Sequence, residues 1–149
     1  MIAVALRYHL ANLADVAAIV GDRIYFQSAP PLVPPPAGNA QLPFIVFYRI
    51  STPRERHLRG SLALPHPRWQ ITCYGLDAIV LESLALAIRM GLDTKRNYDM
   101  GPSDDQVNVR SAILEDERDS YEPPEHGDQF GVYRKDLDFT IWHREVVPA

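Results

Sequence analysis

The sequence has a single cysteine, Cys73, among its 149 residues, so no disulfide can form within the chain. A reducing compartment is the default environment for such a protein. The sequence also has no uninterrupted apolar run of membrane-spanning length, because Arg7, His9 and Asn12 interrupt the apolar N-terminal segment. These absences predict a soluble protein made in the cytoplasm, without a secretory leader or a membrane span.

Catalytic and nucleotide-binding signatures are absent as well. The sequence lacks G-x-S-x-G, a P-loop, G-x-G-x-x-G and H-E-x-x-H. Cys73 alternates with the apolar residues Trp69 and Ile71, which favours a buried structural thiol over a nucleophile. The histidines lack the spacing of a zinc site, and His57 and His66 would meet Cys73 only by chance. We therefore expect no enzyme, no cofactor and no metal site.

The net charge is small, but the charged residues are unevenly distributed along the sequence. The net charge of −4 does not favour a nucleic-acid-binding protein. Residues 49–68 nevertheless contain five arginines and one glutamate, whereas residues 93–129 contain eleven acidic and four basic side chains. The basic segment could contact phosphates, but the overall acidity favours a protein-docking role. The acidic run 115–119 could hold two metal ions, but next to Pro123 and Pro124 a solvated loop is the simpler interpretation.

Hydrophobic periodicity predicts helices over residues 2–20, with a kink allowed near Asn12, and over 77–92, with Asp77 as the N-cap. Strands are predicted over residues 24–26, 44–50, 68–74, 109–114 and 132–143. The remaining segments are predicted to be loops: the proline-rich 28–43, then 51–67, 93–108 and the acidic 115–129. This order predicts one α+β domain over residues 1–149, with a mostly antiparallel sheet of four to five strands and two helices packed on one face. The residues expected to be buried together are Phe44, Val46, Trp69, Ile71, Leu84, Ile88, Phe139 and Ile141.

A series of short motifs resembles the tail-completion proteins of siphophages and related prophages, whose fold is similar to that of the phage lambda tail terminator. An apolar helix runs into V-G-D-R-I-Y at Val20–Tyr25, and L-P-F-I-V-F-Y-R-I followed by S-T-P occupies Leu42–Pro53. R-W-Q-I-T-C-Y at Arg68–Tyr74 leads into an alanine-rich helix, and R-K-D-L-D-F-T-I-W-H occupies Arg134–His143. The resemblance extends over the whole chain.

The resemblance implies a structural protein that forms a hexameric ring at the head-proximal end of a tail tube. Such a ring ends tube polymerisation and joins the tail to the head connector. The implied partners are other copies of the chain, the major tail tube protein and the head–tail connector or stopper protein, while genomic DNA passes through the ring without specific binding. The implied location is the neck of the virion, with assembly in the bacterial cytoplasm and no membrane. A related connector role and a nucleic-acid-binding α+β domain remain the alternatives.

A ring places two different surfaces of neighbouring subunits in contact. Opposite charge on those surfaces favours that contact over like-to-like pairing. We therefore predict that the basic and acidic segments form the subunit interface, with one side made by Arg54, Arg56 and Arg59 and the other by Glu115, Asp116, Glu117 and Asp119. The alternatives are that both segments are solvated, or that they pack together within one subunit.

Overall fold

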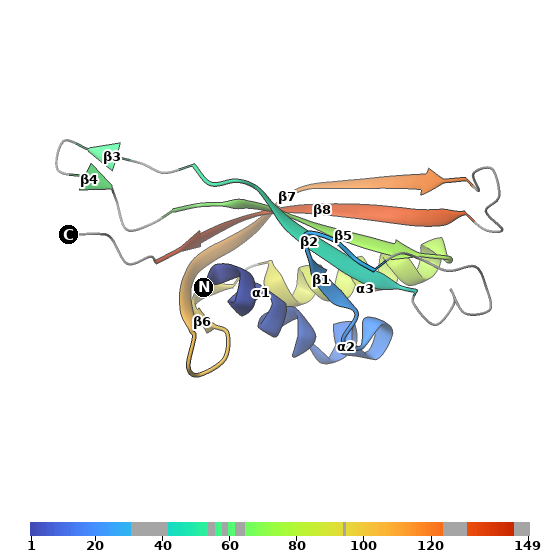
Figure 1. Ribbon diagram of the computed structural model, residues 1–149, viewed down its shortest axis with the longest axis horizontal. Helices are drawn as coiled ribbons and strands as arrows, with labels where there is room; N and C mark the ends of the chain where they lie inside the picture. The colour runs from blue at the N-terminus through green and yellow to red at the C-terminus, as the bar shows by residue number, and fades with distance from the viewer. Residues whose placement is uncertain are drawn as a thin grey trace.

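The computed structural model describes residues 1–30, 42–53, 56–57, 60–61, 65–93, 95–123 and 131–144. Within these ranges, three helices lie on one face of a curled six-stranded sheet (Figure 1). The helices are α1 (Ile2–Ala11), α2 (Ala14–Val20) and α3 (Ala78–Leu92). The strands of the main sheet are β1 (Ile24–Phe26), β2 (Phe44–Ser51), β5 (Arg68–Gly75), β6 (Arg96–Met100), β7 (Val107–Glu122) and β8 (Val132–His143). Their order across the sheet is β1-β2-β5-β8-β7-β6, and a separate two-stranded sheet contains β3 (Arg56–His57) and β4 (Gly60–Ser61).

The predicted α+β class and the placement of the helices on one face are confirmed, but both element counts are wrong. The sheet has six strands rather than four to five, and it is mixed because β1 runs parallel to β2. The additional strand, β6, lies within the predicted loop 93–108 and pairs with the start of β7. Four of its five residues are exposed, so it has no apolar alternation that a sequence pattern could reveal.

The predicted N-terminal helix 2–20 divides into α1 and α2, which gives three helices instead of two. The break lies at Asn12, whose side-chain Nδ2 donates to the Tyr8 carbonyl oxygen, and at Leu13, which has an extended backbone. Because the two helices meet at 83°, both can direct apolar side chains into the same core: Leu6, Leu10, Val16 and Val20 are all fully buried. No single helix of the described ranges is long and apolar enough to cross a membrane. Taken together, α1 and α2 have the length and the composition of a membrane span, but they are bent by 83° where they join.

The main core lies between the helices and the sheet. The predicted alternation in the central strands is confirmed, since Trp69, Ile71 and Cys73 of β5 and Leu137, Phe139 and Ile141 of β8 are fully buried on the helix side. The apolar stripe of α3 packs onto them through Leu81, Leu84, Ala85, Ile88 and Leu92. Asp77 caps this helix as predicted, because its Oδ1 accepts a hydrogen bond from the Ile79 backbone N–H.

The predicted core needs one correction, which concerns β2. Phe44 and Val46 are buried, but they belong to a second, smaller apolar cluster with Leu42 on the face of the sheet that has no helices. The neighbouring residues Ile45 and Phe47 are the ones that reach the main core. Because consecutive strand residues point to opposite faces, a strand that is apolar throughout does not reveal which set faces the helices.

Candidate functional site

The second half of β7 forms an exposed edge of the sheet. The acidic segment 115–129 was predicted to be a loop, and this is wrong for residues 115–122, which continue β7 and pair with β8 as far as Glu122 opposite Val132. On the other side of β7, β6 pairs only with the stretch Val107–Ser111. We call residues 115–122 the β7 edge. Residues 124–130 lie outside the described ranges.

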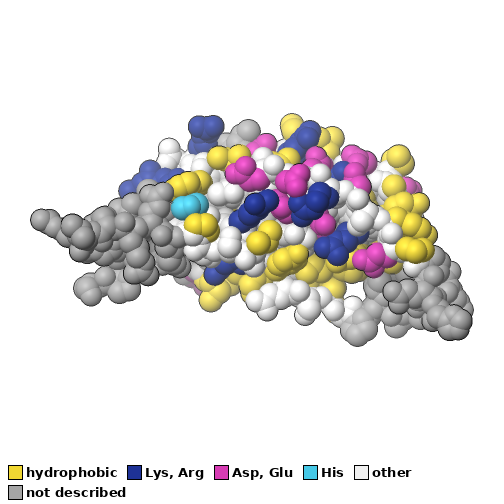
Figure 2. All heavy atoms as spheres, turned by 90° about the horizontal axis from the view of Figure 1, so that it is seen from above, with side chains coloured by type: hydrophobic (Ala, Val, Ile, Leu, Met, Phe, Trp, Pro, Cys, Tyr) yellow, Lys and Arg dark blue, Asp and Glu magenta, His cyan; other side chains and the backbone are white. Residues whose placement is uncertain are grey.

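A charged network covers the face of the sheet that the helices leave open, and Figure 2 shows basic and acidic side chains interspersed there. At its centre is Asp138 of β8, whose side chain is only 3% exposed. Arg118 of the β7 edge donates from Nη1 to Oδ2 at 3.0 Å and from Nη2 to Oδ1 at 3.2 Å. Arg68 of β5 donates from Nη2 to Oδ2 at 3.0 Å. Hydrogen bonds to a charged carboxylate are among the stronger ones in proteins, so this network ties three strands together.

A second buried carboxylate continues the network toward the hairpin tip. Oδ1 of Asp136 accepts hydrogen bonds from Thr72 Oγ1 at 2.8 Å, from Gln70 Nε2 at 3.1 Å and from Arg134 Nε at 3.0 Å. The Arg134 guanidinium also lies over the Tyr74 ring, 5.7 Å from its centroid. The polar atoms of this face are therefore largely engaged with one another.

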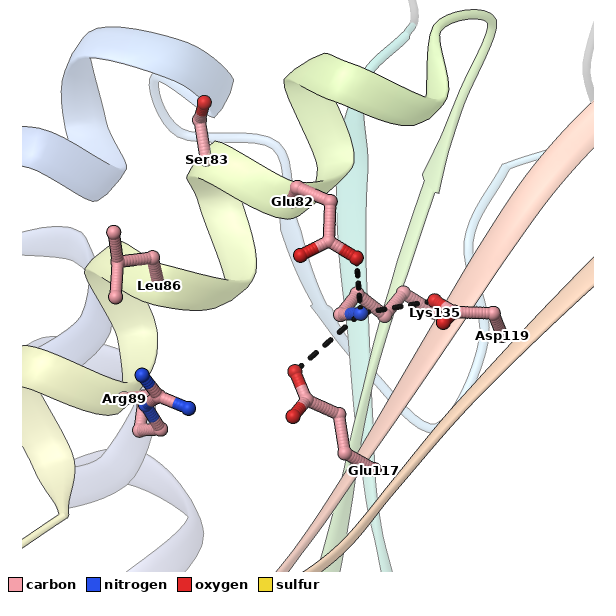
Figure 3. A pocket seen from close by; sticks show the side chains of 7 residues that line it. All are labelled: Glu82, Ser83, Leu86, Arg89, Glu117, Asp119 and Lys135. Atoms are coloured by element: carbon pink, nitrogen blue, oxygen red, sulfur yellow. Dashed lines mark hydrogen bonds and ion pairs between the residues drawn. The ribbon is translucent and has the colours of Figure 1, made fainter.

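On the helix side of the same strands, one lysine holds three carboxylates (Figure 3). The Lys135 side chain is 4% exposed, and its Nζ lies 2.7 Å from Glu82 Oε1, 2.9 Å from Asp119 Oδ1 and 3.4 Å from Glu117 Oε1. Burial by itself would lower the pKa of Lys135, but the hydrogen bonds to Glu82 and Asp119 and the charge of Glu117 raise it above its usual value. Lys135 therefore stays charged and attaches the β7–β8 hairpin to α3.

A groove runs between α3 and the underside of the β7 edge. One part of it encloses about 420 Å³ and is lined by Glu82, Ser83, Leu86, Arg89, Glu117, Asp119 and Lys135 (Figure 3). A second part, also of about 420 Å³, continues toward the start of α3 and the hairpin tip, where Ile79, Tyr121 and Tyr133 contribute. The two parts share Glu82 and Asp119. The groove therefore combines exposed carboxylates with apolar side chains, a composition suited to binding a protein segment.

The residues predicted for the subunit interface lie in two different places. Glu115, Asp116, Glu117 and Asp119 all lie on the β7 edge. Asp116 is bound by Arg118, while Glu117 and Asp119 are bound by Lys135 on the opposite face. The hydrogen bond from Arg118 and one from the Glu117 backbone lower the pKa of the exposed Asp116 carboxyl.

The basic side of the predicted interface is only partly visible. Arg54 and Arg59 lie outside the described residues, and only the backbone of Arg56 is described, in β3. Strands β3 and β4 stand at the end of the molecule opposite the tip of the β7–β8 hairpin (Figure 1). This arrangement separates β3 and β4 from the β7 edge within one chain, although Arg68, at the end of the basic segment, does bind Asp138.

The sequence interpretation missed the partners of the acidic residues. Arg118, Lys135, Asp136 and Asp138 were not named as site residues, although Asp136 and Asp138 share the solvent-facing set of β8 that the alternation predicts. The available signal was the run R-K-D-L-D at residues 134–138, in which charges interrupt a strand on both faces. Such charges need partners on adjacent strands. The charged segment that precedes them in the sequence, residues 115–129, was interpreted as a loop.

The remaining reactive side chains are in structural positions. Cys73 is fully buried, and this burial raises the pKa of its thiol to about 12. Burial lowers the pKa of His9, although its ring nitrogen Nε2 donates to the Gly91 carbonyl oxygen at 2.8 Å. His66 stacks on Trp142, with ring centroids 4.0 Å apart. Within the described ranges, no three His, Cys, Asp or Glu side chains are grouped so that they could hold a metal ion.

No family model matches the chain, and no curated protein matches it. A solved structure shares its fold. It is a chain in the virion of a native gene transfer agent particle, with a TM-score of 0.64 and 19% sequence identity. The similarity covers 96% of the present chain and 93% of the virion chain, so it includes all the layers described above.

Proposed function

We propose that this protein is a structural subunit of a bacteriophage or a related particle, and that it completes the tail as a ring at the head-proximal end. The observation that carries the proposal is the shared fold over nearly the full length of both chains with a component of a gene transfer agent virion. The order of sequence motifs that resembles the tail-completion proteins supports the more specific tail-terminator role.

The shape of the subunit supports assembly through two different surfaces. The β7 edge has five carboxylates against Arg118, and its hairpin tip lies at the opposite end of the long axis from β3 and β4, two strands that belong to the basic segment (Figure 1). A head-to-tail contact between such surfaces generates a ring when the rotation closes. In this proposal the ring is a homohexamer, and its two rims contact the tail tube protein and the head connector.

The chemistry of the site is consistent with an assembly role and with no enzymatic activity. The charged side chains of the open face bind one another and hold strands together, and the thiol of Cys73 is buried with a raised pKa. The basic side chains Arg68, Arg118 and Arg134 are engaged by carboxylates, so this face does not favour binding of nucleic-acid phosphates.

Electron microscopy of particles assembled with and without the protein tests the proposal. Without it, we expect tail tubes of uncontrolled length that carry no heads, and mass spectrometry of complete particles should detect the protein. Tails of normal length that fail to attach to heads would instead indicate a connector role. Complete, infectious or transfer-competent particles formed in its absence would refute the proposal.

A further inference from the structure

The β7 edge has unused backbone hydrogen-bonding groups. Successive residues of a strand direct their N–H and C=O groups to opposite sides. The Ile141 N–H is directed at β5, where it donates to the Pro67 carbonyl oxygen, so the even-numbered residues of β8 are directed at β7. Their register partners on the β7 edge, among them Arg118 and Ser120, therefore face β8. It follows that Glu117, Asp119 and Tyr121 direct their N–H and C=O groups outward, and no strand of the described ranges pairs with them. The Glu117 N–H donates to Oδ1 of Asp116, so the N–H groups left for a further strand are those of Asp119 and Tyr121.

The groove lies next to this free edge and selects what can bind there. Its walls are the β7 edge and α3, which together could enclose one extended segment of chain. Three carboxylates line it, those of Glu82, Glu117 and Asp119, and their side chains are 62%, 34% and 71% exposed. Lys135, the cation between them, is buried beneath. Arg89 and Arg134 also line the groove, so the excess of negative charge comes from the β7 edge itself, which has five carboxylates against Arg118. This excess favours a basic incoming segment.

The same chain contains such a basic segment. Residues 52–61, which we call the arm, contain Arg54, Arg56 and Arg59 against Glu55. Strands β3 and β4 of the arm pair with one another in a separate two-stranded sheet. An isolated pair of strands is marginally stable in water and gains stability when a third strand is added. The arm thus needs an additional strand, and the β7 edge has a free side.

We propose that the arm of one copy adds as a strand to the β7 edge of the next copy, with its arginines directed at the carboxylates of the groove. This inference rests on the ring of the proposed function and specifies its subunit contact as a continuous sheet. Pairing of two β7 edges would place like charges opposite one another, which is unfavourable. Pairing within one chain is disfavoured because β3 and β4 and the hairpin tip lie at opposite ends of the molecule (Figure 1).

Substitution of Asp119 separates the backbone contribution from the side-chain contribution. Asp119→Pro and Asp119→Ala both remove the carboxylate, but only proline also removes the outward N–H, which the β7–β8 ladder does not use. We expect self-association, measured by sedimentation velocity, to be about ten-fold weaker for the proline variant than for the alanine variant. Thermal melting should show both variants folded. Equal association of the two variants overturns strand addition but leaves a ring built by side chains, and with it the proposed function, intact.

Disulfide trapping provides a second test that does not depend on the proline variant. One variant carries His57→Cys in the arm and the other carries Ser120→Cys on the β7 edge, and the two variants are mixed under oxidising conditions. The native Cys73 does not take part because it is fully buried. We expect mixed dimers of the two variants. Dimers of Ser120→Cys with itself would mean that two β7 edges pair, and monomers throughout would mean that the arm does not reach the edge. Either result overturns the inference.

Discussion

The buried carboxylate of Asp138 provides the strongest test of the charged network. Asp138→Asn preserves the shape of the side chain but replaces one acceptor oxygen by a donor and removes the charge. The wild-type carboxylate accepts three hydrogen bonds, two from Arg118 and one from Arg68. The asparagine oxygen retains at most part of this set, and its amide group then faces a guanidinium that is also a donor.

The size of the effect follows from the exposure of the partners. Hydrogen bonds to a charged group contribute about 1.5–3 kcal/mol each. Arg68 and Arg118 have side chains 44% and 45% exposed, so water replaces part of what they lose. We therefore expect Asp138→Asn to lower the free energy of unfolding by about 2–3 kcal/mol, or roughly 5–10 °C in Tm for a chain of this length.

Asp116→Asn is the matched control, because Asp116 also accepts from Arg118 but its side chain is 49% exposed. Both variants and the wild type are compared by thermal and urea denaturation at neutral pH and low salt. Asp116→Asn should change Tm far less than Asp138→Asn. Equal effects of the two substitutions, or no effect of Asp138→Asn, would show that burial does not determine the strength of this network.

Three further predictions concern the core. Phe139→Ala should lower the unfolding free energy by about 3–5 kcal/mol, and Phe44→Ala, in the small open-face cluster, by less; the reverse order in urea denaturation would contradict the assignment of the two faces. Burial raises the pKa of the Cys73 thiol from 9.0 to about 12, so the unfolded state loses the thiol proton first as the pH rises. Stability should therefore fall by about 1 kcal/mol between pH 9 and pH 10. Cys73→Ala should reduce this loss of stability between pH 9 and 10. An unchanged loss in the variant would mean that other titrating groups cause it. Gly91→Ala should cost about 1–3 kcal/mol, because its added methyl group would overlap the Leu13 side chain where α2 meets α3; an unchanged Tm would mean that Leu13 moves aside freely.

The sequence predicts the parts of the fold in which one face is apolar and the other polar. The bounds of β8, 132–143, are as predicted, and the cap and the apolar stripe of α3 are found where the periodicity places them, apart from Val80, which is 36% exposed. These elements pack directly on the main core, so burial imposes a period on their side chains. The hydrophobic pattern is therefore a reliable guide to them.

The pattern fails where both faces of a strand contact water or charge. The β7 edge projects with one face toward the Lys135 cluster and the other toward the Asp138 network, so its sequence E-D-E-R-D-S-Y-E has no apolar alternation. Its strand structure depends on cross-strand partners that are distant in sequence, and a single sequence does not show which charges meet. For the candidate site, the sequence therefore indicated the acidic segment but neither its partners nor its free edge.

The position of β8 has a consequence for the biosynthesis of the protein. β8 is the last strand of the sheet to be synthesised, yet it lies in the middle, between β5 and β7. Until residue 143 has left the ribosome, β5 and β7 have no strand to connect them, and the halves of the sheet on either side remain separate. The helices and the β2–β5 pair can assemble earlier, but the sheet closes in a single late step that depends on contacts remote in sequence. A nascent chain therefore cannot present a complete β7 edge to another copy before residue 143 has left the ribosome.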